Sequence, residues 1–248
     1  MNKNKLEESA PFSIARFLRS RAARRLIALS LVTASTFPLV GQKPVSIPEE
    51  IEWTWEVRPP HPDAQLPNVL LLGDSIARNY FSQVTKDLAG VANVYLMSSS
   101  ASVGDPRLPQ QIAEFSTMEK VRFRVLHFNN GMHGWGYSEA QYQAAFPQFL
   151  RAVLSVLDKG SAVIWANTTP VRADAATGAT NARIEERNAI AEKLVKAAGI
   201  PIDDQHSLMI EHRDLYQDDV HFNPTGANIQ GDQAASVIRS ALRAAVPK

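Results

Sequence analysis

From about residue 68 onward, the chain alternates short apolar runs with longer segments in which apolar residues recur every three or four positions. The runs are nearly continuous in apolar residues and are flanked by turn-forming residues, a pattern that predicts buried strands. They lie at 68–73, 93–98, 123–130, 162–170 and 200–204. The periodic segments predict helices. These lie at 77–90, 109–119, 138–158, 180–198 and 225–245. The alternation predicts an α/β fold, a three-layer α/β/α sandwich around a central, mostly parallel five-stranded sheet.

The first 41 residues differ from the rest of the chain. They hold seven of the 26 Lys and Arg residues but two of the 25 Asp and Glu residues. A mostly apolar run of 15 residues, 26–40, follows the basic stretch and is short for a bilayer span. A basic segment, an apolar segment and small residues together predict an export signal over 1–41. The alternative is an amphipathic helix or an uncleaved anchor helix. We expect a periplasmic or extracellular protein whose mature domain is not stably inserted in a membrane.

Residues 42–65 form a lead-in that is rich in Pro and charge and has no sustained period. Within it, Trp53 and Trp55 alternate with polar residues, which predicts a short edge strand. The regular part, 66–248, has a length typical of one domain.

Composition excludes several classes of function. The chain has no Cys, which excludes thiol catalysis, disulfides and Cys-based zinc sites. Beyond residue 41 the chain is mildly acidic, so it lacks the basic footprint of a nucleic-acid-binding protein. No H-E-x-x-H spacing and no Gly-rich nucleotide-binding motif is present. We therefore expect neither a metal nor a cofactor.

A serine stands where the first apolar run ends, in the sequence "NVLLLGDSIARNYF" at 68–81. In parallel α/β folds the site lies at the carboxyl ends of the strands, beside helix N-termini. Ser75 therefore lies where backbone amides can stabilise developing negative charge. The alternative is that Asp74 or Ser75 only caps the helix that follows.

A nucleophilic serine needs a base, and one of the six His residues has a suitable position. His221 belongs to "DDVHFNPTGA", 218–227, just after the last predicted strand and before the last predicted helix. Asp218 precedes it by three residues, so a tight turn brings the carboxylate to the imidazole. The alternative is a solvated loop with an Asx cap on the last helix. His127 falls inside a predicted strand and is expected to pack in the core.

Together, these residues resemble the SGNH, or GDSL-type, hydrolases. Gly73-Asp74-Ser75-Ile76 resembles their first block and Asp218-Asp219-Val220-His221 their final Asp-x-x-His block. The resemblance covers roughly 66–246 and implies a flavodoxin-like fold and ester hydrolysis through an acyl-serine. It implies that Ser75 is the nucleophile, His221 the general base and acid, and Asp218 the orienting carboxylate, in preference to Asp219.

The family also places a Gly and an Asn beside the oxyanion. The Gly corresponds to Gly104 in "SSSASVGDPRL". The Asn falls in "HFNNGMHGWGY", 127–137, which departs from the family's Gly-x-Asn-Asp. Register from the strand places Asn130 on the family's Asn, with Asn129 as the alternative.

The same loop offers candidate substrate contacts. Trp135, Tyr137 and His133 could stack on a sugar ring beside the serine, or they could be core or lid residues. Arg172, at the end of the fourth strand, could bind a substrate carbonyl or carboxylate, or be a surface or capping residue. A rival nucleophile, in "GYSEA" at 136–140, lacks a leading strand and the last Gly of its motif.

We therefore expect an exported serine esterase acting without cofactor, with a small-molecule or polysaccharide ester as substrate. The resemblance and the polar loops favour a carbohydrate O-acetyl esterase. The alternatives are a catalytically silent glycan- or cell-wall-binding module on the same fold, a lipase or lysophospholipase, and an acyltransferase. Covalent labelling of the serine separates the binding module from the enzymes.

Overall fold

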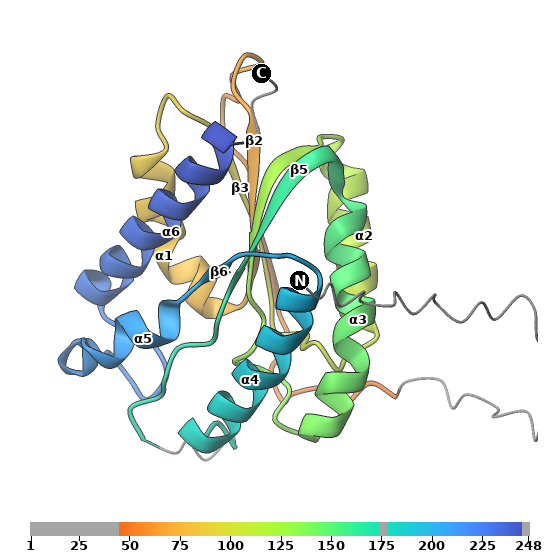
Figure 1. Cartoon of the computed structure of the whole chain (residues 1–248), viewed down its shortest axis with the longest axis vertical. Helices are drawn as coiled ribbons and strands as arrows, with labels where there is room; N and C mark the ends of the chain where they lie inside the picture. The colour runs from red at the N-terminus through yellow and green to blue at the C-terminus, as the bar shows by residue number, and fades with distance from the viewer. Residues whose placement is uncertain (1–44, 174–177, 245–248) are drawn as a thin grey trace, which may run out of the picture. The chain divides into compact units, whose positions relative to one another are not determined.

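The apolar runs form one twisted sheet in a computed structural model that describes residues 45–173 and 178–244 (Figure 1). Five strands are parallel neighbours. They are β2 (Asn68–Gly73), β3 (Asn93–Ser99), β4 (Phe123–Phe128), β5 (Leu157–Ala166) and β6 (Ile202–Asp203). A sixth strand, β1 (Thr54–Val57), pairs antiparallel with β3 at the sheet edge, so the strand order is β1-β3-β2-β4-β5-β6. The mostly parallel α/β sandwich is confirmed.

The sheet has one strand more than the five that were predicted for it. The additional strand, β1, comes from the lead-in, and the edge strand predicted around Trp53 and Trp55 is confirmed in β1, which includes Trp55. A strand that pairs antiparallel needs no helical crossover. The sequence beside β1 therefore lacks the helical pattern that accompanies the parallel strands. Part of the 42–65 segment is therefore built into the sheet.

Helices cover both faces of the sheet (Figure 1). α1 and α6 pack on one face, and α2, α3 and α4 pack on the other. Their bounds are α1 (Ser75–Asp87), α2 (Arg107–Glu119), α3 (Glu139–Ser155), α4 (Asn181–Ala197) and α6 (Pro224–Ala244). Two short elements follow β6, the helix α5 (Gln205–Ile210) and a 3-10 turn at Arg213–Leu215.

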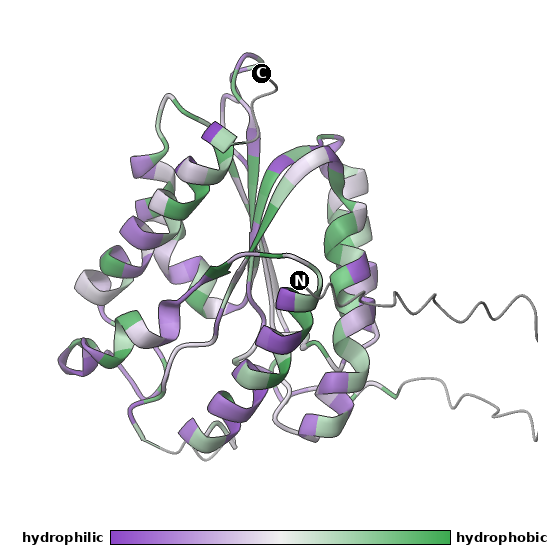
Figure 2. Cartoon of the chain, in the orientation of Figure 1, coloured by the Kyte–Doolittle hydropathy of each residue, from purple (hydrophilic) through white to green (hydrophobic). Residues whose placement is uncertain are grey.

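Alternation along the strands divides the core into two layers. In β2, Leu70 and Leu72 join the cluster beneath α2, α3 and α4, whereas Val69 and Leu71 join the cluster beneath α1 and α6. Successive side chains of a strand point to opposite faces, so a run that is apolar throughout indicates a strand buried on both sides. Figure 2 shows the matching pattern, with hydrophobic strands at the centre and helices that are polar on part of their surface.

The parallel strands bring their carboxyl ends to one edge of the sheet, where the loops after β2, β3, β4 and β5 meet. Ser75 and the other candidate residues follow those strand ends. Among residues 45–173 and 178–244, none of the helices combines the length and apolar character needed to cross a bilayer. The predicted export signal, 1–41, lies outside the described residues.

Candidate active site

Ser75 opens α1, and Asp74 is the residue that caps the helix. The fully buried Asp74 carboxylate accepts a hydrogen bond from the Ile76 amide (3.0 Å) and another from the Met132 amide (3.2 Å). Ser98 Oγ donates to the Asp74 carbonyl (2.7 Å). Since Asp74 supplies the cap, the Ser75 hydroxyl is available for another partner.

That partner is His221, which lies 146 positions further along the chain. Ser75 Oγ and His221 Nε2 are 2.7 Å apart, and His221 Nδ1 lies 2.9 Å from Asp218 Oδ2. Ser75 is buried, whereas the His221 side chain is 29% exposed. The structure thus brings together the three residues predicted for the triad, in hydrogen-bonding order and at the helix N-terminus.

A tight turn holds Asp218 against the imidazole. Asp218 Oδ1 accepts hydrogen bonds from the backbone amides of Val220 (2.8 Å) and His221 (2.7 Å). Partial burial disfavours the carboxylate, but these amides and the His221 side chain outweigh that effect and lower the pKa of Asp218. Asp218 is therefore ionised at neutral pH and suited to orient a histidine.

Arg172 contacts the turn that carries Asp218. Its guanidinium donates to the Asp218 carbonyl, and its backbone amide donates to the Asp219 carbonyl (2.8 Å). The guanidinium also lies over the Tyr216 ring, 5.7 Å from the centroid. These contacts give Arg172 a role in positioning the turn, and its predicted contact with substrate stays a prediction.

Asn129 and Asn130 differ in what their side chains bind. Asn130 Nδ2 donates to the Ala101 carbonyl (3.0 Å), which joins the loops after β4 and β3. Asn129 packs against Gly73, two residues before Ser75; a Cβ on Gly73 would lie 2.3 Å from Asn129 Oδ1. The Asn129 backbone amide donates to the Leu72 carbonyl (3.0 Å), whereas its side chain makes no hydrogen bond to any described residue and its Oδ1 is buried without a partner. The structure thus leaves the alternative candidate, Asn129, available beside the nucleophile.

Gly104 lies against Tyr137 and lines a cavity of about 250 Å³ with Val103, Pro109 and Phe149, among others. Neither Ser75 nor His221 lines this cavity. A Cβ at this position would come within 2.6 Å of the Tyr137 ring, so packing alone requires a glycine. Its predicted role at the oxyanion stays a prediction.

Trp135 has internal partners. Its indole N–H donates to the Met132 carbonyl (2.8 Å), and the Arg187 guanidinium lies 4.2 Å from its ring centroid. Arg187 is almost completely buried and donates to the carbonyls of His133, Gly134 and Tyr137, each at 3.0 Å. Trp135 and Arg187 therefore hold the loop after β4 in shape.

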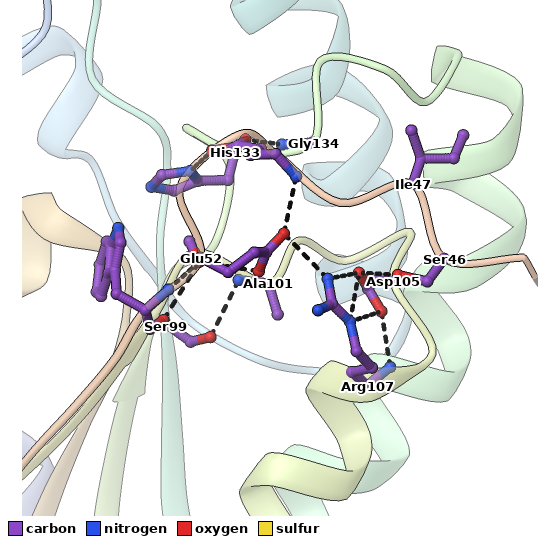
Figure 3. Close-up of polar contacts among 12 residues, drawn as sticks. Ser46, Ile47, Glu52, Ser99, Ala101, Asp105, Arg107, His133 and Gly134 are labelled. Atoms are coloured by element: carbon purple, nitrogen blue, oxygen red, sulfur yellow. Dashed lines mark hydrogen bonds and ion pairs between the residues drawn. The ribbon is translucent and has the colours of Figure 1, made fainter.

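Sequence reasoning missed the contribution of the lead-in to this loop. Glu49 accepts hydrogen bonds from His133 Nδ1 (2.8 Å) and the Gly134 amide (2.9 Å). Figure 3 shows the neighbouring contacts, in which Ser46 binds Asp105 and Arg107 binds Glu52. Residues 45–53 have no periodic sequence pattern. Only the fold therefore reveals that they bind and hold the loops after β3 and β4.

The Glu49–His133 pair predicts a dependence of stability on pH. Burial opposes both charges, but the mutual hydrogen bond and attraction, with the Gly134 amide on Glu49 and the Asp74 and Glu52 charges near His133, together outweigh it, so the pKa of Glu49 is lowered from 4.5 and that of His133 is raised from 6.5. Stabilisation from Glu49 is lost as pH falls through its lowered pKa, and that from His133 is lost as pH rises through its raised pKa. The pair therefore stabilises the fold most between about pH 4.5 and 6.5.

Replacing Glu49 with Gln should lower the melting temperature by about 2–4 °C near pH 5.5, which corresponds to roughly 1 kcal/mol at this chain length. The difference from wild type should shrink as the pH rises through the raised pKa of His133, because the imidazole then loses its charge. Thermal unfolding across this range measures the effect, with the exposed Glu50→Gln as control. An equal difference at pH 5.5 and pH 8 would contradict the ion pair.

Other candidates take structural positions. Ser138, the rival nucleophile, caps α3: its Oγ accepts from the Gln141 amide (3.2 Å), and the Gln141 side chain accepts from the Ser138 amide. His127 is fully buried and bonded to Asp203 (2.8 Å), which agrees with its predicted place in the core. Within the described ranges, no group of three or more His, Asp or Glu side chains is arranged to hold a metal ion.

No protein-family model and no curated protein sequence matches the chain. Solved structures do match it. A lipolytic protein of the G-D-S-L family from Veillonella parvula is 18% identical with a TM-score of 0.54, over 68% of this chain and 97% of that one. An acetylxylan esterase from Geobacillus stearothermophilus is 13% identical with a TM-score of 0.56, over 69% and 94%.

A third solved structure that matches the chain is the C-terminal catalytic domain of peptidoglycan O-acetyltransferase A from Streptococcus pneumoniae. It is 19% identical with a TM-score of 0.53, over 71% of this chain and 94% of that one. At these identities the likeness concerns the fold. The protein has the fold of the GDSL, or SGNH-type, hydrolases, as the motifs around Ser75 and His221 predicted.

Proposed function

We propose that this protein is a serine-dependent ester hydrolase that works through an acyl-serine. The observation that carries the proposal is the hydrogen-bonded series Ser75–His221–Asp218 at the start of α1. A serine hydroxyl needs an adjacent base to become a nucleophile, and an imidazole needs a fixed tautomer to act as that base. The series meets both requirements.

In the first half-reaction, His221 carries its proton on Nδ1, hydrogen-bonded to Asp218, and its Nε2 takes the proton of Ser75. Ser75 Oγ then attacks the ester carbonyl carbon. The negative charge that develops on the carbonyl oxygen is stabilised by the Ser75 backbone amide and by the side-chain amide of Asn129. The positive end of the α1 dipole adds to this stabilisation.

Collapse of the tetrahedral intermediate breaks the bond between the acyl carbon and the alcohol oxygen. His221 gives its proton to that oxygen, and the alcohol leaves. Water then attacks the acyl-Ser75, with His221 taking a proton from the water. The second intermediate collapses, the proton returns to Ser75 Oγ, and the carboxylic acid leaves and loses its own proton to the solvent.

For the substrate, we propose a carbohydrate O-acetyl ester, met outside the cytoplasm after export through the 1–41 segment. Two of the compared structures are named an acetylxylan esterase and a peptidoglycan O-acetyltransferase. Serine is also frequent where β3 ends: Ser99 closes the strand, and Ser100 and Ser102 follow in the loop, all three of them buried. A loop with this polar interior suits a sugar better than a long acyl chain.

The substrate proposal is tested with p-nitrophenyl esters of increasing acyl length and with acetylated xylo-oligosaccharides. We expect kcat/KM to fall at least about tenfold from acetate to octanoate, because a short-acyl site gains nothing from the longer chain. We also expect acetate release from the oligosaccharides. A preference for octanoate would indicate a lipase and would overturn the acetyl ester.

An acyltransferase uses the same three residues and differs in what attacks the acyl-serine. The acetyltransferase among the compared structures favours testing it directly. Incubation with p-nitrophenyl acetate and a tenfold range of a free oligosaccharide, followed by mass spectrometry, distinguishes the two. We expect acetate to be the main product; a sugar acetate that rises with sugar concentration would indicate transfer.

A further inference from the structure

Arg78 lies one turn after the candidate nucleophile, on the same side of α1. Residues three apart on a helix are surface neighbours, with about 5–6 Å between their Cβ atoms. The Arg78 guanidinium lies 5.0 Å from the ring centroid of Trp53 and 5.3 Å from that of Trp55. Trp53 and Trp55 are two apart in an extended segment, so they point to the same face. The three side chains form one cluster.

The charge of Arg78 is not neutralised within this cluster. Among residues 45–173 and 178–244, no side chain or carbonyl accepts a hydrogen bond from its guanidinium, and no carboxylate lies within ion-pair distance. Arg107 and Arg183, in contrast, each bind a carboxylate, at 2.5 Å and 2.7 Å. Stacking on indoles uses the flat faces of a guanidinium and leaves its N–H edge to bind a planar anion.

The cluster adjoins the residues around Ser75. The Trp53 ring meets the His133 ring edge-on, with 5.7 Å between centroids. The next residue towards the N-terminus from His133 is Met132, whose amide binds Asp74, the residue before Ser75. Trp53 also lines a cavity of about 570 Å³ with Glu49, Ile51 and Gly134, among others, but Arg78, Trp55 and Ser75 do not line it. Because Arg78 lies one helical turn from Ser75, a ligand on the cluster would lie near an ester held at Ser75.

The shape and charge of the cluster define a ligand. Trp55 is 53% exposed, and a flat indole with an accessible surface suits the apolar face of a sugar ring. A guanidinium edge suits a carboxylate, which it can bind through two parallel hydrogen bonds. Because the chain beyond residue 41 is mildly acidic, its net charge does not attract anions, so any preference for a carboxylate must come from a local cation.

We infer that Arg78, Trp53 and Trp55 form a subsite for a sugar that carries a carboxylate, placed next to the acetylated position. The inference rests on the proposed ester hydrolysis and makes it more specific: the substrate is an acetylated acidic glycan. Arg78 binds the carboxylate, and the indoles pack against the ring.

The test compares two substrates that differ only in charge, the O-acetylated methyl glycosides of glucuronic acid and of glucuronamide. Acetate release gives kcat/KM for each, and their ratio is the readout. We expect wild type to prefer the acid by about tenfold or more, the size of a charge-assisted hydrogen-bond pair. Arg78→Gln should reduce the ratio to near one, through KM, and Arg78→Lys should give an intermediate ratio.

The matched control is Arg151→Gln, which removes the same charge from an exposed position on α3 that makes no hydrogen bond to a described residue. Its ratio should equal that of wild type. Calorimetric titration with the non-acetylated acid and amide provides the same comparison without turnover, in wild type and in Arg78→Gln.

The outcomes separate the two proposals. Equal kcat/KM or equal affinity for acid and amide in wild type, or an undiminished preference in Arg78→Gln, would overturn the subsite while p-nitrophenyl acetate hydrolysis still supported the esterase. If the wild-type protein hydrolysed none of the esters, the proposed ester hydrolysis would be overturned. The calorimetric comparison would then be the remaining test of the carboxylate subsite.

Discussion

Replacing Ser75 with Ala is expected to abolish covalent labelling by a fluorophosphonate and to lower kcat for p-nitrophenyl acetate by about 10⁶, as loss of a nucleophile does in other serine hydrolases. The reason is that Ser75 Oγ is the atom hydrogen-bonded to His221 Nε2, at 2.7 Å. The fold should persist, because Asp74 and not Ser75 supplies the helix cap. Intact-mass spectrometry of the treated protein measures the adduct.

The matched control is Ser138→Ala, which removes the serine of the rival "GYSEA" sequence. Ser138 caps α3 with a full capping box, so this variant should lose about 1 kcal/mol of stability and keep its labelling. Labelling that survives in Ser75→Ala but not in Ser138→Ala would reverse the assignment. If folded wild-type protein gave no adduct, the hypothesis of a catalytically silent binding module would be favoured over the esterase.

The second large effect is expected at Asn129. Asn129→Ala should lower kcat by about 10²–10³ with little change in KM, because an oxyanion donor acts on the transition state and barely on the bound ester. The structural reason is that the Asn129 side chain lies beside Gly73, two residues before Ser75, and makes no hydrogen bond to any described residue, so its N–H groups are not committed elsewhere.

Asn130→Ala is the contrasting variant. The Asn130 amide is bound to the Ala101 carbonyl, so its loss leaves a buried acceptor unpaired and should cost about 1–3 kcal/mol of stability, with a smaller effect on kcat. Steady-state kinetics and thermal unfolding of both variants separate the two effects. A larger loss of kcat in Asn130→Ala than in Asn129→Ala would restore Asn130 as the donor.

The motifs predicted correctly which side chains come together, and their catalytic roles stay predictions. Asp218 and His221 are three residues apart, so a single turn is enough to join them, and the sequence around them shows that turn. Ser75 is separated from them by almost the whole domain, but strand ends in a parallel sheet meet at one edge, so the order of elements was enough to predict the meeting.

Predictions stayed open where the sequence allowed two neighbouring side chains the same role, or one side chain two roles. Asn129 and Asn130 are adjacent and chemically identical, and only the position of Ala101 and Gly73 in space distinguishes them. Arg172 was considered for substrate, whereas the fold places it on the turn of Asp218. Trp135 has its indole N–H and one ring face occupied by Met132 and Arg187.

Sequence alone determined the α/β class, the parallel strands and the residues of the triad, because hydrophobic periodicity and short motifs are local properties of the chain. Tertiary structure alone decided which asparagine side chain is available beside Ser75, that residues 45–53 contact the loops after β3 and β4, and that the Arg78 guanidinium lies close to two tryptophan rings near Ser75. These are contacts between segments distant in sequence, and each depends on packing geometry that no local pattern encodes.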